Sequence, residues 1–391
     1  MALRILAISS HDIDGPDSGA TIRARAIFQL LARFGSVHVV QAGRSDSPAN
    51  DASASRSGLG PCELLRLHQA PNNTLVQRWR HETDPRYLNT NLQQASPADQ
   101  ARMRALVADH DLVWIYGLRA ANGFGLYRWP HAVLDVDDIP SSFHRTERLQ
   151  AKPLRKLVLL RKEFLWRRRE KLLRERFDAL CITSEADRPL LPGLDRVFVV
   201  PNGFTPPERP LPRQPATPPR VGFVGQFGYE PNREGFRWFV EQVWPLIRHR
   251  WPEARLRVVG RGGDKLYPDG RDNIDGLGWV ADVEPEMATW SLSVVPIFVG
   301  GGTRIKIAEA LSRRCPIVAT PLGAYGYELA PGREIALAET PEDFAARCLE
   351  ILAHPAQAEA MAERGWETFR TNWTWEANAA RIAKIIETVR S

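Results

Sequence analysis

The stretch Val299–Leu311, VGGGTRIKIAEAL, determines how the rest of this 391-residue chain is interpreted. Three consecutive glycines, Gly300 to Gly302, allow the backbone to turn sharply and to approach a ligand closely. Thr303 is a candidate N-cap for the segment that follows, which contains no helix-breaking residue. A helix that begins directly after a glycine loop presents free N–H groups and a partial positive charge. Such a helix start favours the binding of a phosphate or diphosphate.

Two charged side chains of this stretch, Lys306 and Glu309, are three residues apart and share one face of the predicted helix. A cation near phosphates and a carboxylate one turn further along suit a diphosphate and a ribose diol. An ordinary strand–loop–helix connection with solvated charges is the simpler explanation of the glycine spacing alone, because short glycine motifs are common. The choice between a diphosphate site and an ordinary connection therefore depends on the rest of the sequence.

The composition is that of a globular protein, with 43% hydrophobic and 25% charged residues. The length predicts two domains. The four cysteines are far apart and form no CxxC pair, which argues against a zinc site or a disulfide framework and favours a reducing compartment. Because no apolar run approaches about eighteen residues, we expect no transmembrane helix and a cytoplasmic protein.

The first half alternates between strands and helices. An apolar strand at 4–9, a polar loop, an amphipathic helix at about 21–34 and a strand at 37–41 indicate a βαβ unit with a parallel sheet. Further strands are predicted at 64–67, 112–116, 132–136, 179–182 and 197–200, and helices at 97–109 and 153–176.

A change of composition follows at residues 201–219, which contain eight prolines and favour an extended linker. The alternation then restarts with a strand at 221–224, a helix at 233–250 and a strand at 255–259. Two doubly wound halves place ligands at the carboxyl ends of their strands, facing each other across a cleft.

Four motifs of the second half resemble those of GT-B glycosyltransferases of family 4, the group 1 enzymes. They are VVPNGF (199–204), GFVGQFGYEPNREGFRWFVEQVWPLI (222–247), LGWVADVEPEMATWSLSVVP (277–296) and GGGTRIKIAEALSRRCPIVAT (300–320). The resemblance is dense over residues 197–375 and includes the first half only through its SGATIRA loop.

The resemblance implies an α/β protein with the GT-B fold, that is, two doubly wound Rossmann-like domains that face each other across a cleft. It implies an acceptor-binding domain at 1–205, a proline-rich linker at 206–219 and a nucleotide-sugar-binding domain at 220–372. The last segment, 373–391, is then a helix that crosses back to the N-terminal domain.

The resemblance also assigns residues to the donor. Glu309 is expected to bind the ribose hydroxyls, and the amides of Gly301, Gly302 and Thr303 to meet the diphosphate. The remaining assignments are Gly225 and the adjacent Gln226 to the donor phosphates, Trp279 and Val280 to the base, and Gly19 to the glycine loop that closes over the donor.

Two features depart from the family pattern. The family carries two carboxylates eight positions apart, and the first of these positions is Gly301 here. An Arg and a Lys that usually follow the first strand of this domain are replaced by Gln226 and Asn232. Because electrostatic stabilisation of the leaving diphosphate is usually the largest catalytic contribution, we hypothesise that Arg304 and Lys306 supply the missing charge.

In the N-terminal domain, the turn DVDD at 135–138 follows a predicted strand. Asp137 or Asp138 is a candidate for orienting an acceptor hydroxyl or a donor-sugar hydroxyl, and capping of the next helix explains them equally well. His11 follows the first strand in the same way. No metal is implied, and no cofactor is required besides the nucleotide-diphosphate sugar as donor.

The basic helix at 154–177 is the main source of the positive charge, since residues 147–176 contain twelve Lys or Arg and four Asp or Glu. Leucines between these cations suit an interfacial helix on anionic lipid, which would make the protein peripheral on the inner face of the membrane. A solvated helix packed on its own domain is the structural alternative. No recognition motif for nucleic acid accompanies the patch, so we expect no nucleic-acid partner.

The resemblance therefore predicts a glycosyltransferase of the hexosyltransferase type. It would move a sugar from a nucleotide-diphosphate donor to a saccharide or lipid-linked acceptor in polysaccharide or glycoconjugate biosynthesis, with retention of configuration. Two alternatives remain: a non-hydrolysing nucleotide-sugar 2-epimerase and a non-catalytic nucleotide-sugar-binding protein.

Overall fold

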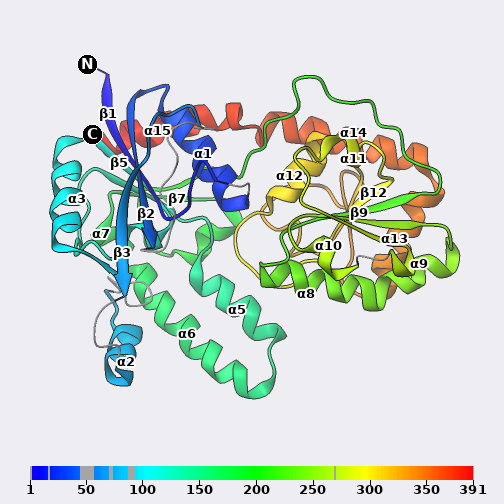
Figure 1. Cartoon of the computed structure of the whole chain (residues 1–391), viewed down its shortest axis with the longest axis horizontal. Helices are drawn as coiled ribbons and strands as arrows, with labels where there is room; N and C mark the ends of the chain where they lie inside the picture. The colour runs from blue at the N-terminus through cyan, green and yellow to red at the C-terminus, as the bar shows by residue number, and fades with distance from the viewer. Residues whose placement is uncertain are drawn as a thin grey trace. The chain divides into compact units, whose positions relative to one another are not determined.

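A computed structural model describes residues 2–15, 18–44, 57–69, 74–86, 93–267 and 270–390. The chain divides into two compact units, the first containing Met1–Pro201 and Asn378–Ser391, and the second containing Asn202–Ala377. Each unit has its own mainly parallel sheet with helices around it, as the alternation of strands and helices predicts (Figure 1).

Over the described residues, the sheet of the first unit has eight strands in the order β4-β3-β2-β1-β5-β6-β7-β8, and β3 pairs antiparallel with β4. The order reverses between β1 and β5, which makes these two strands the switch point of a doubly wound sheet. The strands are β1 (Leu3–Ser9), β2 (Gly35–Arg44), β3 (Glu63–Gln69), β4 (Gln93–Ala95), β5 (Leu112–Tyr116), β6 (Ala132–Asp135), β7 (Ala179–Ile182) and β8 (Val197–Val199).

Helices surround this sheet and a pair of them extends away from it. They are α1 (Gly19–Leu31), α2 (Leu75–Thr83), α3 (Pro97–Asp109), α4 (Leu118–Ala121), α5 (Pro140–Gln150), α6 (Pro153–Lys171), α7 (Leu173–Arg176), a 3₁₀ turn at Glu185–Leu190 and α15 (Trp375–Arg390). The single basic helix expected at 153–176 is wrong in one respect. It is interrupted at Leu172, whose N–H bonds to the carbonyl of Arg169 and so tightens the last turn of α6.

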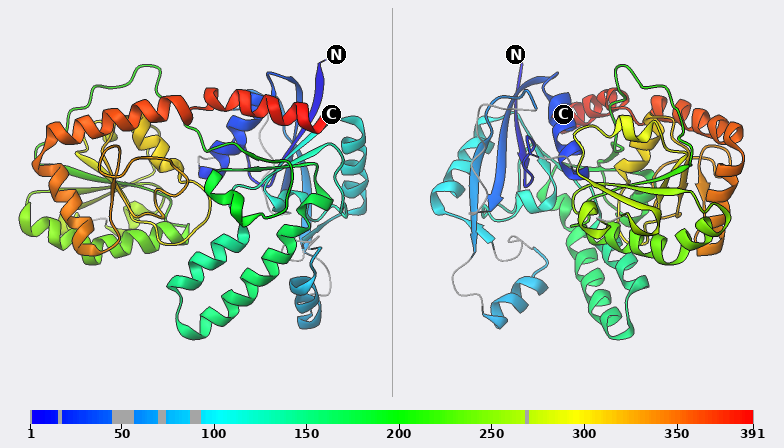
Figure 2. Two further views of the ribbon diagram at one scale, coloured as in Figure 1. Left: turned by 180° about the vertical axis from the view of Figure 1, so that it is seen from behind. Right: turned by 45° about the vertical axis from the view of Figure 1, so that its right-hand side comes forward.

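The pair that extends from the sheet, α5 and α6, forms an antiparallel helical hairpin (Figure 2). Glu163 of α6 is buried and forms ion pairs with Arg148 of α5 at 3.0 Å and with Arg167 at 2.7 Å. At the base of the hairpin, Glu170 accepts a hydrogen bond from the backbone N–H of Ser141 at 2.8 Å. Charged groups on the inner side of the hairpin therefore hold its two helices together.

The sheet of the second unit has six parallel strands in the order β11-β10-β9-β12-β13-β14. Here the order reverses between β9 and β12. The strands are β9 (Arg220–Val224), β10 (Arg255–Val259), β11 (Ile274–Gly278), β12 (Leu292–Val295), β13 (Ile317–Ala319) and β14 (Ala336–Leu337). The helices are α8 (Glu230–Trp238), α9 (Trp244–Arg250), α10 (Gly263–Leu266), α11 (Glu284–Met287), α12 (Ile305–Ser312), α13 (Pro341–Ala353) and α14 (Pro355–Asn372), with a 3₁₀ turn at Arg271–Asn273.

The continuous helix predicted at 233–250 contains a π-helical turn at Phe239–Val243, between α8 and α9. Pro245 is two residues beyond this turn, and a proline has no N–H and clashes with the carbonyl four residues before it. A wider turn at this point accommodates the ring.

Close packing in the core of the second unit depends on Gly222 of β9. The indole of Trp290, which is fully buried, lies against this glycine, and a Cβ at position 222 would be 1.8 Å from the ring. Only a residue without a side chain fits between the strand and the ring.

The proline-rich segment does not run free of the second unit. The N–H groups of Gln214 and Ala216 donate to the carbonyls of Ala288 and Thr289, each at 2.9 Å. The backbone of Leu211 donates to the carboxylate of Glu284 at 2.7 Å. The segment is extended, as the prolines predict, but it packs on the surface of the second unit through its remaining N–H groups.

Candidate active site

The residues predicted to bind the donor follow three strands of the second unit: β9, β11 and β12. Because these strands are parallel, their carboxyl ends lie at one edge of the sheet. Gly225 directly follows β9, and the glycine loop 300–302 follows β12 by a few residues, so both lie at the switch point where doubly wound sheets bind ligands. Trp279 directly follows β11, the edge strand two positions from β9.

The glycine loop is buried and has a conformation that favours glycine. Gly300 has φ of +139° and Gly302 has φ of +61°, values that residues with a side chain rarely adopt. Gly301 and Thr303 are also buried. The side-chain amide of Asn202 donates to the carbonyl of Thr303 at 3.2 Å and holds the end of the loop.

Thr303 does not cap the helix, contrary to the sequence-based expectation. Helix α12 begins at Ile305, its N-cap is Arg304, and no side chain at that cap accepts a hydrogen bond. The carbonyl of Arg304 accepts from the N–H of Ile307 at 2.9 Å and from the hydroxyl of Tyr327 at 2.9 Å, which fixes the start of the helix after position 303. The hydroxyl of Thr303 is buried and bonds to no described residue.

Arg304 folds back over the glycine loop. Its Nη1 donates to the carbonyls of Gly301 and Gly302, and its Nη2 lies against Gly300, where a Cβ would be 2.4 Å away. Within the described part of the chain, its Nε and Nη2 are buried and make no hydrogen bond. A guanidinium with unused N–H groups beside a glycine loop can bind an oxyanion.

Lys306 reaches away from its own helix toward the loop after β9. Its Nζ donates to the side-chain oxygen of Asn232 at 2.7 Å and lies 5.0 Å from the centre of the Phe223 ring. Burial, reinforced by the charge of Arg304 and opposed by Glu309, lowers the pKa of Lys306 from 10.5 to about 7. An anion bound here would raise this pKa again.

Glu309 lies on α12 one turn beyond Lys306 and is mostly buried. Its carboxylate pairs with Arg313 at 3.4 Å, and the guanidinium of Arg313 lies 5.1 Å from the centre of the Phe204 ring. A carboxylate offers about four acceptor positions, and the two hydroxyls of a ribose diol are donors that such a group can accept from.

The loop after β9 is held close to β10 and α8. The N–H of Gly225 donates to the carbonyl of Val259 at 2.9 Å, and a Cβ at Gly225 would be 2.9 Å from the amide nitrogen of Asn232. The carbonyl of Gln226 accepts from that amide nitrogen at 3.0 Å. Gly225 and Gln226 are half-buried, so their backbone lies at the surface of the switch point.

The two residues assigned to the base differ in exposure. Trp279 is 53% exposed, whereas Val280 packs against the hydrophobic core formed around α12. Gly278 before them has φ of +67°, which turns the chain out of β11. An exposed indole at the carboxyl end of a strand offers a surface for stacking.

At the switch point of the first unit, three side chains meet that follow or end different strands. The hydroxyl of Tyr116, the last residue of β5, donates to Asp137 at 2.7 Å, and the His11 ring lies 5.8 Å from the Tyr116 ring centre to centre. Burial raises the pKa of Tyr116, and Asp137 adds to the effect. Desolvation lowers the pKa of His11, with Arg119 adding to the effect and Asp137 opposing it.

Asp138 and Gly19 are the other residues of the first unit that the sequence predicts to contribute to the site. Asp138 is half-buried next to Asp137, and the N-cap of the following helix α5 is Ile139, whose side chain makes no capping bond. Gly19 is the first residue of α1 and is exposed, while Ser18 caps this helix by accepting from Thr21 at 3.1 Å.

The first carboxylate of the DVDD turn, Asp135, has a structural role. It is fully buried and pairs with the fully buried Arg23 of α1 at 2.8 Å, and Arg23 also donates to the carbonyl of Val200 at 2.9 Å. Burial raises the pKa of Asp135 and Arg23 opposes this effect. The pair ties α1 to the end of β6 and to the residue that follows β8.

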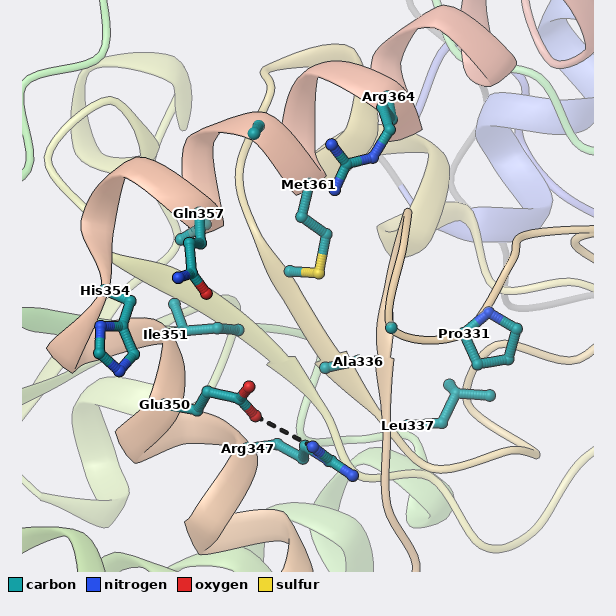
Figure 3. Close-up of a pocket in the computed structure, with 13 residues that line it drawn as sticks. Pro331, Ala336, Leu337, Arg347, Glu350, Ile351, His354, Gln357, Met361 and Arg364 are labelled. Atoms are coloured by element: carbon teal, nitrogen blue, oxygen red, sulfur yellow. Dashed lines mark hydrogen bonds and ion pairs between the residues drawn. The ribbon is translucent and has the colours of Figure 1, made fainter.

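A cavity of about 510 Å³ lies in another part of the second unit, between β14, α13 and α14 (Figure 3). Met361 and Ile351 point into it, and the Arg347–Glu350 ion pair of 3.0 Å lies at its rim. None of the residues predicted to bind the donor lines this cavity.

Two properties bear on metals and membranes. In the described ranges, no group of three or more His, Cys, Asp or Glu is arranged to hold a metal ion. Across the helices that the structure describes, none is both long and apolar enough to span a bilayer.

Several side chains of these sites were not singled out from the sequence. Tyr116 and Tyr327 were missed because a tyrosine at a strand or loop end carries no signal of its own. Asn202 belongs to the VVPNGF motif but was given no role. Asn232 was noted only as a missing cation. Their positions depend on strand order, which one sequence does not reveal.

Residues 218–354 match the family described as glycosyl transferases group 1. A comparison with curated proteins finds no match.

Solved structures resemble almost the whole chain. Sucrose-phosphate synthase from Thermosynechococcus elongatus has a TM-score of 0.67 and 19% identity, with 99% of each chain covered. HepE from Anabaena, in complex with UDP and glucose, has a TM-score of 0.62 and 14% identity, covering 98% of this chain and 99% of its own. WaaG, a glycosyltransferase involved in lipopolysaccharide biosynthesis, has a TM-score of 0.62 and 15% identity with the same coverage. At these identities the likeness is one of fold.

Proposed function

We propose that this protein is a glycosyltransferase that transfers a sugar from a nucleotide-diphosphate donor to a saccharide or lipid-linked acceptor. The match of residues 218–354 to the group 1 glycosyl transferases and the likeness of the whole chain to solved structures with the GT-B fold support this proposal. We propose retention of configuration and a role in polysaccharide or glycoconjugate biosynthesis. The family match favours transfer over a 2-epimerase or a non-catalytic binding protein.

One observation carries the assignment of the donor site. At the switch point between β9 and β12, a buried glycine loop, two cationic side chains (Arg304 and Lys306) and the carboxylate of Glu309 come together. In the proposal, the loop and the two cations bind the diphosphate, and Glu309 accepts hydrogen bonds from the ribose. Trp279 and Val280 contact the base, and the backbone of Gly225 and Gln226 lies against the phosphates.

The cations also account for catalysis in this proposal. When the bond between sugar and diphosphate breaks, negative charge grows on the leaving phosphate. Fixed positive groups that are already partly desolvated stabilise this charge without reorganisation. No metal ion is needed in this scheme. Asp137 and Asp138 of the first unit are proposed to orient hydroxyls of the acceptor or of the donor sugar, and Gly19, the first residue of α1, is proposed to contact the donor.

The donor is tested first by ligand binding. In a thermal-shift panel of UDP, GDP, dTDP and ADP, one nucleotide should raise the melting temperature of the protein more than the others do, because a ligand that binds only the folded state stabilises it. UDP is the natural starting point, since a structural neighbour is described in complex with UDP and glucose. If none of the four raises the melting temperature at millimolar concentration, the proposed donor site is wrong.

Turnover then separates transfer from the alternatives. Incubation of the matching nucleotide sugar with candidate saccharide and lipid-linked acceptors should release the nucleotide only when an acceptor is present. Isomerised donor without acceptor would indicate an epimerase, and donor binding without any turnover would indicate a binding protein. The configuration of the new bond, read by proton NMR, tests retention.

We also propose that the α5–α6 hairpin and α2 contact an anionic membrane surface, where a lipid-linked acceptor would be found. Large apolar side chains are exposed on both elements, including Leu154 at 86%, Leu157 at 68% and Trp79 at 62%. Arg169 of α6 donates to the backbone carbonyl of Glu82, and Arg161 pairs with its carboxylate at 2.9 Å, so α2 is attached to the hairpin.

The positive charge of the α5–α6 hairpin also supports contact with an anionic membrane. Residues 140–171 contain eleven Lys or Arg and three Asp or Glu. Two of these carboxylates, Glu163 and Glu170, are buried inside the hairpin. Apolar side chains among exposed cations are typical of helices that lie in the headgroup region of anionic lipid, where each cation contributes about 1 kcal/mol.

Vesicle co-sedimentation tests this proposal. The protein should sediment with vesicles rich in phosphatidylglycerol at low salt, and Leu154→Glu with Leu157→Glu should abolish binding. Leu246→Glu is a matched control, because Leu246 is also exposed but belongs to the second unit. Equal binding of all three proteins, or no binding of the wild type, would refute the membrane contact.

A further inference from the structure

Asn232 lies in the first turn of α8 and is buried, with its side chain fixed at both ends. Its Nδ2 donates to the carbonyl of Gln226 at 3.0 Å, and its Oδ1 accepts from Nζ of Lys306 at 2.7 Å. A backbone carbonyl only accepts and an ammonium only donates, so the side-chain amide has a single favourable orientation. Asn232 therefore joins the loop after β9 to the side chain of a residue on α12.

The partner of this amide is a cation that comes from the other side of the switch point. Lys306 belongs to α12, after β12, yet its side chain passes over the Phe223 ring of β9 and ends beside position 232. The family pattern places a cation at position 232. Here that position is Asn232, and the amine of Lys306 from another segment lies beside it. The two residues are 74 positions apart.

The surroundings of this amine leave it without a bound counter-charge of its own. Its hydrogen-bond acceptor is a neutral amide, and none of the ion pairs in the described ranges includes Lys306. The charged groups that face it are Arg304, which disfavours the ammonium, and Glu309, which favours it. A cation that is desolvated beside another cation gains most from an incoming anion.

We propose that Asn232 is a positioning residue that holds the Lys306 ammonium at the carboxyl end of β9, where it binds the diphosphate of the donor. The inference rests on the proposed function, because it places the diphosphate at this edge of the sheet. Without the amide, the long side chain of Lys306 samples other rotamers, and part of the ordering cost is incurred when the anion binds.

The test is a double-mutant cycle with inorganic pyrophosphate as the probe and titration calorimetry at pH 6.5 as the readout. Asn232→Ala should weaken pyrophosphate binding by about ten-fold, the size of a lost hydrogen bond to a charged group. Lys306→Met should weaken it more. In the Lys306→Met background, Asn232→Ala should have no further effect, because Asn232 acts only through the lysine.

The isosteric variant Asn232→Asp keeps the packing and supplies a second, independent readout. The added carboxylate pairs with Lys306, so pyrophosphate binding should weaken and the midpoint of its pH dependence should move upward by a unit or more. Asn372→Ala, at the end of α14, is the matched control and should bind as the wild type does.

The outcomes are distinguishable. Additive effects of Asn232→Ala and Lys306→Met, or an unchanged pH midpoint in Asn232→Asp, would overturn the positioning role while leaving the donor site intact. Failure of the wild type to bind pyrophosphate and every nucleotide of the panel would instead overturn the proposed function. Thermal melting of each variant shows whether it is folded.

Discussion

Replacing Lys306 with Met should stabilise the folded protein and at the same time weaken its donor site. Methionine has a similar length and no charge, so the contact with Phe223 is retained and the ammonium is lost. In the folded protein the pKa of Lys306 is lowered from 10.5 to about 7. At about 1.4 kcal/mol for each pH unit, keeping this amine protonated costs the native state up to about 5 kcal/mol.

The dependence on pH follows from the direction of this shift. The unfolded chain binds the lysine proton up to pH 10.5 and the folded chain only up to about pH 7. The stability of the wild type therefore rises with pH between these values, through this residue, and Lys306→Met removes the rise. The advantage of the variant should be greatest below pH 7 and should disappear as the pH approaches 10.5.

A second contribution opposes the first. In Lys306→Met the buried oxygen of Asn232 loses its donor, which costs about 1–3 kcal/mol at every pH. We therefore expect Lys306→Met to be about 2–4 kcal/mol more stable than the wild type at pH 6.5. Near pH 10 it should be less stable by about 1 kcal/mol, within the same ranges.

Urea unfolding at pH 6.5, 8, 9 and 10, followed by tryptophan fluorescence, measures the difference. Lys265→Met is the matched control, because Lys265 is exposed on α10 of the same unit, and its change should stay within about 0.5 kcal/mol at each pH. A wild-type minus Lys306→Met difference that does not vary with pH would refute the argument, since it would mean that the amine titrates normally in the folded state.

Three further predictions test the donor site, a buried ion pair and the core. Glu309→Ala should raise the donor KM by about 10–100-fold in steady-state kinetics. In this variant, a donor that lacks the ribose hydroxyls should have the same KM as the intact donor. Asp135→Asn should lower the free energy of unfolding by about 3–5 kcal/mol because Arg23 stays buried without its counter-charge, and adding Arg23→Met should recover part of the loss in urea. Gly222→Ala should cost at least about 1–3 kcal/mol through overpacking against the buried indole, whereas Gly228→Ala, with open space around the new methyl group, should change urea stability by less than about 0.5 kcal/mol.

The fold was predictable where local signals agree with burial. The bounds of α3 and β5 are those expected from the sequence, because Ser96 and Pro97 mark the start of the helix and the strand is a continuous apolar run. Helix α2 was not predicted. Its sequence LVQRWRHET is mostly polar and none of its side chains is buried, although Thr74 and Gln77 form a capping box that a search for this pattern would have found.

The sequence predicts which residues belong to the candidate site, but it does not predict all of the contacts between them. The glycine loop, Lys306 and Glu309 are neighbours in the sequence, so their common location follows from the local motif. The bond from Lys306 to Asn232 follows from the strand order, which brings the segments after β9 and β12 together. The start of α12 was misplaced at Thr303 because the hydroxyl of Tyr327, distant in sequence, anchors the carbonyl of Arg304.

We also expect the α5–α6 hairpin to affect how copies of this protein associate in solution. At about 0.1 M salt the Debye length is about 10 Å, and the cations around Leu154 and Leu157 keep two hairpins apart. At about 1 M salt it falls to about 3 Å, and the exposed leucines can then pair. We expect reversible self-association that grows with ionic strength, a dependence opposite in sign to that of binding to anionic lipid. Low salt should therefore favour binding of this surface to anionic lipid, and high salt should favour its contact with a second copy of the chain.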